Sequence, residues 1–180
     1  MQARFVLFII LTIIFTSICS YAAEVKEADL AGSWYTSSRA ELENQLKSYL
    51  DKANPEKTDG RILAIIVPHA GYAYSGPVAA YSFKATQDKG IKTVIVVGFS
   101  HRKFFDGIAI YDKGSWRTPL GDIQIDETLA KEIEKNPRVR FNPDLFKEEN
   151  SVEMQIPFIQ TSLKDVKIIH LVKLQRMKKR

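Results

Sequence analysis

Two histidines each follow an apolar run of the kind that forms a buried strand. His69 is the second residue after the run 61–67 (RILAIIV), and His101 is the fourth residue after the run 93–97 (TVIVV). Residues 76–89 between the two runs are predicted to form a helix. A strand–helix–strand unit brings both strand ends to one edge of a parallel sheet, where such sheets bind ligands. Because neutral imidazole binds transition metals, the pattern predicts a metal site containing His69 and His101.

Other polar side chains close to these histidines in the sequence are candidates for a substrate-binding or supporting role. Ser100 directly precedes His101 and could orient its ring through the hydroxyl group. Tyr72 and Tyr74 follow His69 and could place phenol groups near a substrate, or pack the loop instead. Two loop histidines without any ligand role remain the alternative, since two imidazoles do not close a metal site.

Asn150 and Glu153 complete the set of candidate site residues. Asn150 can form hydrogen bonds to a substrate, but it is a poor metal ligand and no base near neutral pH. Glu153 lies three residues further on, and could either support the site or lie at the surface.

Five motifs in a fixed order carry a family resemblance. They are AGSWY (31–35), PHAGYAYSGPVAA (68–80), SH (100–101), TPLGD (118–122) and ENSVEMQIPF (149–158). With these motifs the chain resembles the Memo family, protein B of the AmmeMemoRadiSam system. The resemblance implies a fold similar to the class III non-haem iron dioxygenases, iron as the metal, and a redox or oxygenase-type activity with His69 and His101 as metal ligands.

Two departures from the family pattern bear on that implied activity. Asn150 stands where the family has a histidine. The family also continues into a segment with a cysteine–histidine pair whose cysteine binds the metal, whereas here the resemblance stops near residue 169 and basic residues follow. We therefore expect the C-terminal part of the fold to be missing, a weakly bound metal or none, and no role for His170.

The first 22 residues have the features of a secretory signal peptide. Arg4 precedes an apolar run over 5–15, and small residues at positions 20 and 22 favour cleavage after Ala22. A membrane anchor is the alternative, but the run is shorter than the roughly 20 residues that span a bilayer. We expect an exported chain, periplasmic or secreted, without a stable anchor. Its single cysteine, Cys19, would leave with the signal, so no disulfide or thiolate ligand would remain.

The positive charge lies at the end of the chain. The whole sequence has a formal net charge of +5. Residues 164–180 contain seven Lys or Arg and one Asp, and residues 24–163 have a net charge of −2. The predicted organisation is a signal peptide over 1–22, a partial Memo-like domain over 24–163 and a divergent basic tail over 164–180. We expect no nucleic-acid partner, because the domain is mildly acidic and charge runs are usually solvated.

The predicted fold class is α/β, with a largely parallel sheet flanked by helices. Alternating apolar runs and helical patterns support it. The expected elements besides those above are a helix capped by Ser38, a strand over 107–111, a helix capped by Asp126, a helix beginning at Ser151 and a strand over 166–172.

Two functions from different classes remain open at this point. One is a Memo-like, iron-binding redox protein that is impaired because part of the domain is missing. The other is a non-catalytic exported protein, an adaptor or an inactive fragment, whose crevice binds a small molecule or a peptide.

Overall fold

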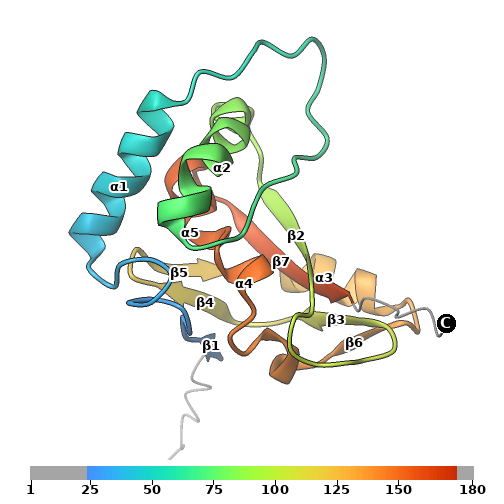
Figure 1. The fold of residues 1–180 in the computed structure, drawn as a ribbon. Helices are drawn as coiled ribbons and strands as arrows, with labels where there is room; N and C mark the ends of the chain where they lie inside the picture. Colours follow the sequence, from blue (N-terminus) through green and yellow to red (C-terminus); the bar gives the residue numbers. More distant parts are fainter. Residues whose placement is uncertain (1–23, 174–180) are drawn as a thin grey trace, which may run out of the picture.

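A mixed four-stranded sheet forms the centre of the structure, a computed structural model that describes residues 24–173 (Figure 1). Its strand order is β2-β7-β3-β6. β2 (Thr93–Phe99) pairs in parallel with β7 (Lys167–Lys173), and β3 (Ile108–Tyr111) pairs in parallel with β6 (Val139–Phe141). β3 runs antiparallel to β7, so the sheet is mixed, but two of its three strand pairs are parallel and the predicted α/β class is confirmed.

A smaller sheet lies beside the first one. β4 (Ser115–Thr118) pairs in parallel with β1 (Val25–Lys26) and antiparallel with β5 (Gly121–Gln124). Residues 119–120 form the turn between β4 and β5, as the TPLGD motif predicts. Through this sheet, residues 25–26 near the start of the described chain pair with residues 115–116.

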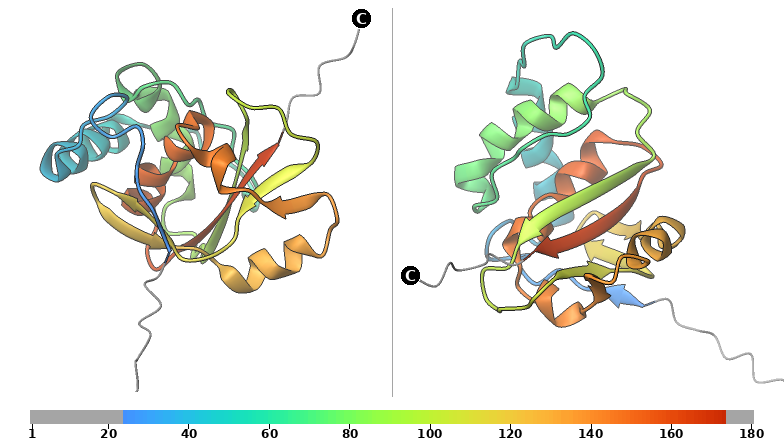
Figure 2. Two further views of the ribbon diagram at one scale, coloured as in Figure 1. Left: turned by 90° about the horizontal axis from the view of Figure 1, so that it is seen from below. Right: turned by 90° about the vertical axis from the view of Figure 1, so that its right-hand side faces the viewer.

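Three helices pack together on one face of the central sheet. α1 (Arg39–Lys52) and α2 (Tyr72–Thr86) contact each other, and both contact α5 (Ile156–Ser162) (Figures 1 and 2). Ser38 caps α1 as predicted, because its side chain accepts a hydrogen bond from the Glu41 amide at 3.4 Å.

Helix α3 covers the opposite face of the sheet, and α4 packs against β2 and β7. α3 (Glu127–Glu134) contacts β3 and β6 and is capped by Asp126, as predicted. α4 (Asn150–Glu153) follows a 3-10 helix over Pro143–Phe146 and contacts β2 and β7. The single helix predicted from Ser151 through Phe158 is therefore two short helices, α4 and α5, and the first begins one residue earlier than predicted.

Aromatic and leucine side chains form the main core between the helices and the sheet. Phe83 of α2 stacks on Phe158 of α5 with ring centroids 5.0 Å apart, and Tyr72 meets Phe158 edge-on at 5.2 Å. Leu42 and Leu46 of α1 are completely buried in the same cluster. The positions of the three helices are therefore set by their apolar faces.

The apolar run 61–67 is not a strand in this structure, which corrects the strand prediction. The run forms no backbone ladder with β2, whose partner is β7. Leu63 is 84% exposed and Ile66 is 96% exposed. An apolar run needs a hydrogen-bonded neighbour to become a strand, and no other described residue provides one.

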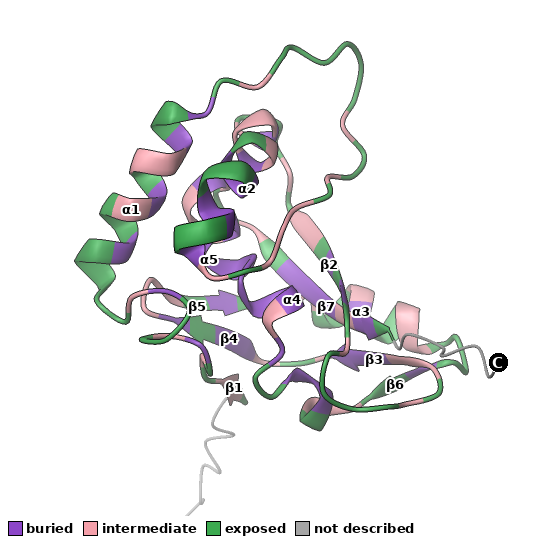
Figure 3. Ribbon diagram, in the orientation of Figure 1, coloured by how far each residue is buried: buried purple, intermediate pink, exposed green. Residues whose placement is uncertain are grey.

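The last described strand, β7, belongs to the buried core (Figure 3). The predicted strand over 166–172 is therefore confirmed within one residue. His170, which the sequence reading treats as incidental, is completely buried in this strand. The proposed division between domain and tail at residue 164 stays a prediction, and residues 1–22 of the predicted signal lie outside the described residues.

Among residues 24–173, none of the helices combines the length and the apolar character that crossing a bilayer requires.

Candidate metal site

The two predicted histidines come together at the end of β2. The ring centroids of His69 and His101 lie 5.3 Å apart, with an angle of 59° between the ring planes. His101 is the second residue after β2, so it lies at the end of a strand as predicted. His69 lies between the irregular run 61–67 and α2, so a different set of contacts must hold its loop.

Side-chain amides from the α4 region hold the His69 loop in place of a strand ladder. The Asn150 Nδ2 group donates to the backbone carbonyl of His69 at 3.0 Å. Gln155 Nε2 donates to the backbone carbonyl of Pro68 at 3.3 Å. Asn150 therefore supports the site by positioning His69, and it does so through the backbone.

Glu149 makes two contacts with His101 and a third with the start of α4. Its carboxylate accepts hydrogen bonds from the His101 backbone amide at 2.8 Å and the Ser151 amide at 2.9 Å, and it lies 2.8 Å from His101 Nδ1. The side chain is only 1% exposed. Because a carboxylate accepts hydrogen bonds, the proton of the neutral His101 ring lies on Nδ1, and this tautomer leaves the lone pair of Nε2 free. This is the arrangement in which a histidine orients toward a metal ion.

Electrostatics favour a neutral His69 and an ionised Glu149. Burial and the neighbouring His101 lower the pKa of His69 below its usual value, so its ring is uncharged near neutral pH. Burial alone would raise the pKa of Glu149, but hydrogen bonds from His101 and Ser151 outweigh it and lower the pKa. Both states suit cation binding, which needs deprotonated ligands.

The two tyrosines predicted near the site lie in different environments. Tyr72 is 1% exposed, and its hydroxyl donates to the Met154 carbonyl at 2.8 Å. Burial raises the pKa of Tyr72 well above its usual value, so the phenol stays protonated. Tyr74, by contrast, is 84% exposed. Tyr72 thus packs the core, which was the alternative role for these side chains.

Ser100 and Glu153 also bind groups other than the two imidazoles. The Ser100 hydroxyl donates to the Lys103 carbonyl at 2.8 Å, and the role of orienting His101 falls to Glu149. Glu153 is completely buried and accepts hydrogen bonds from the Asp29 and Leu30 amides at 3.0 and 2.8 Å. It anchors the N-terminal segment.

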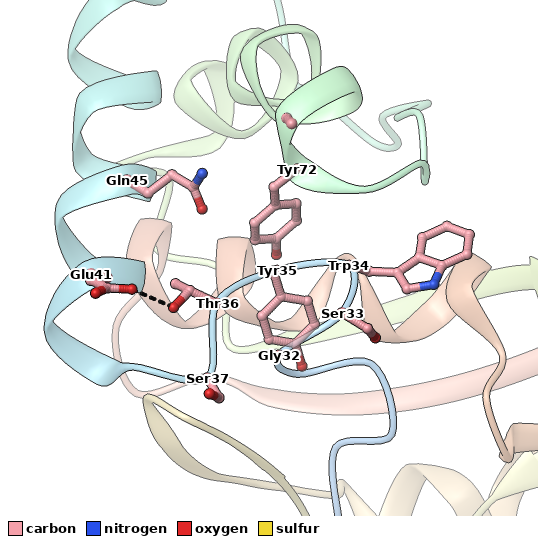
Figure 4. A pocket seen from close by; sticks show the side chains of 10 residues that line it. Gly32, Ser33, Trp34, Tyr35, Thr36, Ser37, Glu41, Gln45 and Tyr72 are labelled. Carbon is pink, nitrogen blue, oxygen red and sulfur yellow. Dashed lines mark hydrogen bonds between the residues drawn. The ribbon is translucent and has the colours of Figure 1, made fainter.

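The AGSWY loop forms a separate hollow (Figure 4). The cavity has a volume of about 530 Å³ and is lined by residues of the loop, α1 and the start of α2, including Trp34, Glu41 and Gln45. Tyr35 in its wall donates to Glu153 at 2.9 Å. Neither His69 nor His101 lines this hollow.

Within residues 24–173, no cluster of three or more His, Cys, Asp or Glu side chains could hold a metal ion. The pair of imidazoles therefore offers two donors, with Glu149 behind one of them. Glu149 is the functional candidate that sequence reasoning did not assign. Its place directly before Asn150 and Ser151 is the only signal, and it does not reveal that the side chain turns toward His101.

Comparison with known proteins supports the family assignment. The model of the family described as Memo-like protein matches residues 26–179. The chain is 36% identical to the Protein memo-1 homolog of Caenorhabditis elegans over 162 residues, which cover 87% of this chain and 45% of that protein. It is 40% identical to a MEMO1 family protein of Pyrococcus furiosus over 81% of this chain and 51% of that protein. The chain spans about half the length of these curated relatives, and it belongs to the Memo family.

Proposed function

We propose that His69 and His101 bind a divalent transition metal ion, iron by family resemblance, and that the chain carries the corresponding part of a redox or oxygenase-type site. The observation that supports this proposal is the approach of the two imidazole rings to 5.3 Å at the end of β2. Crevices at the carboxyl ends of strands are the usual ligand sites of α/β sheets.

The donor set fits a metal ion of borderline softness. Glu149 holds the proton on Nδ1 of His101 and leaves Nε2 available. His69 is neutral because burial lowers its pKa, so both rings can donate a lone pair. Bound iron would supply one-electron chemistry at open coordination positions.

With two imidazole donors only, residues 24–173 are expected to bind a metal ion weakly. An iron site of the dioxygenase type uses about three protein ligands, commonly two histidines and a carboxylate. Asn150 uses its Nδ2 group to hold the His69 backbone, and Glu149 uses its carboxylate on His101 and Ser151. Neither group is left as a third ligand, so we expect an affinity below that of a complete site.

Calorimetric titration of the purified chain with Fe²⁺ under anaerobic conditions tests the proposal. We expect weak, saturable binding with one ion per chain, and His69→Ala or His101→Ala should each reduce the affinity at least about tenfold. Tyr74→Ala is the matched control, because this exposed side chain is close in sequence and bonds neither ring. Binding that both alanine variants leave unchanged would refute the site.

The second candidate function is a non-catalytic binding protein or adaptor. It is supported by the short donor set and by the 530 Å³ hollow at the AGSWY loop, which contains neither histidine. A chain with no measurable Fe²⁺ affinity, but unchanged folding in the two alanine variants, would favour this candidate over the metal site.

We also propose that the chain is exported and cleaved after Ala22. The support is the charged, apolar and small-residue pattern of residues 1–22. Mass spectrometry of the protein from its native host should find Ala23 as the first residue, and an intact N-terminus would refute cleavage.

A further inference from the structure

A cavity of about 390 Å³ runs along the outer edge of β2. One wall is the strand itself, from Val94 to Phe99, and another contains Ile65, Ile66 and Val67 of the irregular run 61–67. His69 and Ser151 also line it. The slot, defined here as this space between β2 and the run 61–67, is therefore bounded by an apolar strand and an apolar irregular segment, and Phe83 of α2 and Ile159 of α5 also line it.

The β2 side of the slot presents free backbone groups. In a parallel ladder, alternate residues direct both N–H and C=O to the same neighbour. The Lys92 carbonyl and the Ser100 amide bond to β7, so even-numbered residues of β2 face β7 and odd-numbered residues face the slot. Ser151 Oγ satisfies both backbone groups of Phe99 at 3.2 Å. The amides of Ile95 and Val97 face the slot and have no strand partner among the described residues.

The run 61–67, on the opposite side of the slot, also has unpaired backbone groups. Within the described part of the chain, no residue of the run 61–67 takes part in a backbone–backbone hydrogen bond, and Ile66 receives one bond at its carbonyl from the Ser82 hydroxyl. The run is strongly apolar, yet Leu63 and Ile66 are almost completely exposed. On β2, Ile95, Val97 and Phe99 are 47%, 62% and 53% exposed. Two unpaired edges with uncovered apolar side chains flank one cavity.

We propose that the slot accepts an extended, apolar β-strand from a polypeptide outside residues 24–173, which pairs with the free edge of β2 and lies against the run 61–67. Strand addition satisfies backbone groups on such edges, and alternate apolar side chains determine specificity. The occupant is the counterpart of the part of the curated relatives that this chain does not match, because the match covers only 45% and 51% of the length of the two relatives. A second copy of this chain fits poorly, because its own run 61–67 stands in front of its β2 edge.

Synthetic peptides test the proposal on the full 180-residue chain. The probes are overlapping 15-residue peptides that cover the part of the Pyrococcus furiosus relative outside the matched region. We expect one apolar peptide to bind, and to slow hydrogen exchange at the Ile95 and Val97 amides by at least about tenfold, since these amides gain partners. Amides that face β7, such as that of Val96, should change little.

Val97→Pro is the diagnostic variant. Proline removes the outward N–H but no bond of the β2–β7 ladder, a substitution that edge strands tolerate. We expect it to weaken peptide binding at least about tenfold, while Val97→Thr, which keeps the N–H, retains binding. If Val97→Pro fails to fold, the peptide can be changed instead. N-methylation of alternate peptide residues removes the N–H groups that would pair with β2, and it should weaken binding in the same way.

The outcomes distinguish the possible occupants. Protection of the two amides by a peptide, abolished by Val97→Pro or by N-methylation, supports the proposal. Three results would each overturn the proposal. They are the absence of binding by any peptide, peptide binding that is unaffected by Val97→Pro and by N-methylation, and amide protection that increases with the concentration of the chain without peptide.

Discussion

His170→Leu should make the protein more stable. His170 lies in the middle of β7 and is completely buried. Neither of its ring nitrogens has a hydrogen-bond partner among the described residues. Its ring meets Trp116 edge-on with centroids 4.4 Å apart. Leucine has a similar volume and no polar atoms, so it removes the unsatisfied groups and keeps most of the packing.

The size of the effect follows from the unpaired nitrogens. A buried polar group without a partner costs about 1–3 kcal/mol, and the lost ring contact with Trp116 is worth about 0.5–1.5 kcal/mol. We expect a net gain of about 1–2 kcal/mol in the free energy of unfolding. For a chain of this size that corresponds to a rise in Tm of about 2–8 °C.

The gain should increase in acid. Burial, with a smaller contribution from Lys26, lowers the pKa of His170 to about 3. The unfolded chain binds a proton near pH 6.5, whereas the folded chain does not bind it until pH falls to about 3. Below about pH 6.5 the unfolded state therefore holds more protons, and wild-type stability falls with decreasing pH. Between about pH 8 and pH 5, proton binding to His170 in the unfolded state should lower the free energy of unfolding of the wild type by roughly 2 kcal/mol. His170→Leu should not show this loss.

Urea unfolding followed by circular dichroism at several pH values measures this difference. Ser162→Ala is the matched control, because the Ser162 hydroxyl is also buried without a partner but does not titrate in this range. Its stability difference from wild type should not depend on pH. A His170→Leu protein that is less stable than wild type, or whose advantage is constant from pH 8 to 5, would refute the burial of an unpaired neutral imidazole.

Three further substitutions distinguish a residue that should affect Fe²⁺ affinity from residues that should affect stability. Glu149→Gln should weaken Fe²⁺ binding by about 10–100-fold, because His101 loses the carboxylate that orients it; an unchanged calorimetric affinity would contradict this role. Glu153→Gln should lower the free energy of unfolding by about 1–3 kcal/mol in urea titrations and leave Fe²⁺ affinity unchanged, because its partners are the Tyr35 hydroxyl and two N-terminal amides. Gly98→Ala should lower stability by about 1–3 kcal/mol, since a Cβ there overlaps the neighbouring helix α4; a neutral result in the same urea assay would show that α4 can shift.

Local signals in the sequence predict most of the helices correctly. Ser38 and Asp126 cap α1 and α3 where the side-chain oxygen can accept an early amide of the helix. These two inferences rest on contacts within a short stretch of chain. His69 and His101 also converge as predicted, although the predicted strand over 61–67 is absent and the side chains of Asn150 and Gln155 hold the His69 loop instead.

Long-range partners explain what the sequence does not reveal. The run 61–67 has the composition of a buried strand, but composition does not supply a hydrogen-bonded neighbour. The direction of β3 against β7 also depends on a loop path that periodicity does not encode. Glu149 was missed for a related reason, since its partner His101 is 48 residues away in the sequence.

The segment that contains α4 connects the parts of the site. Within seven residues it bonds four separate regions: the His101 loop, the His69 loop, the end of β2 and the N-terminal segment. The bonding side chains are those of Glu149, Asn150, Ser151, Glu153 and Gln155. Most of these side chains are buried, and buried polar groups are stable only when they are paired. A polar motif with this role can therefore change the proposed metal site by moving the two histidine loops, without any of its residues acting as a ligand.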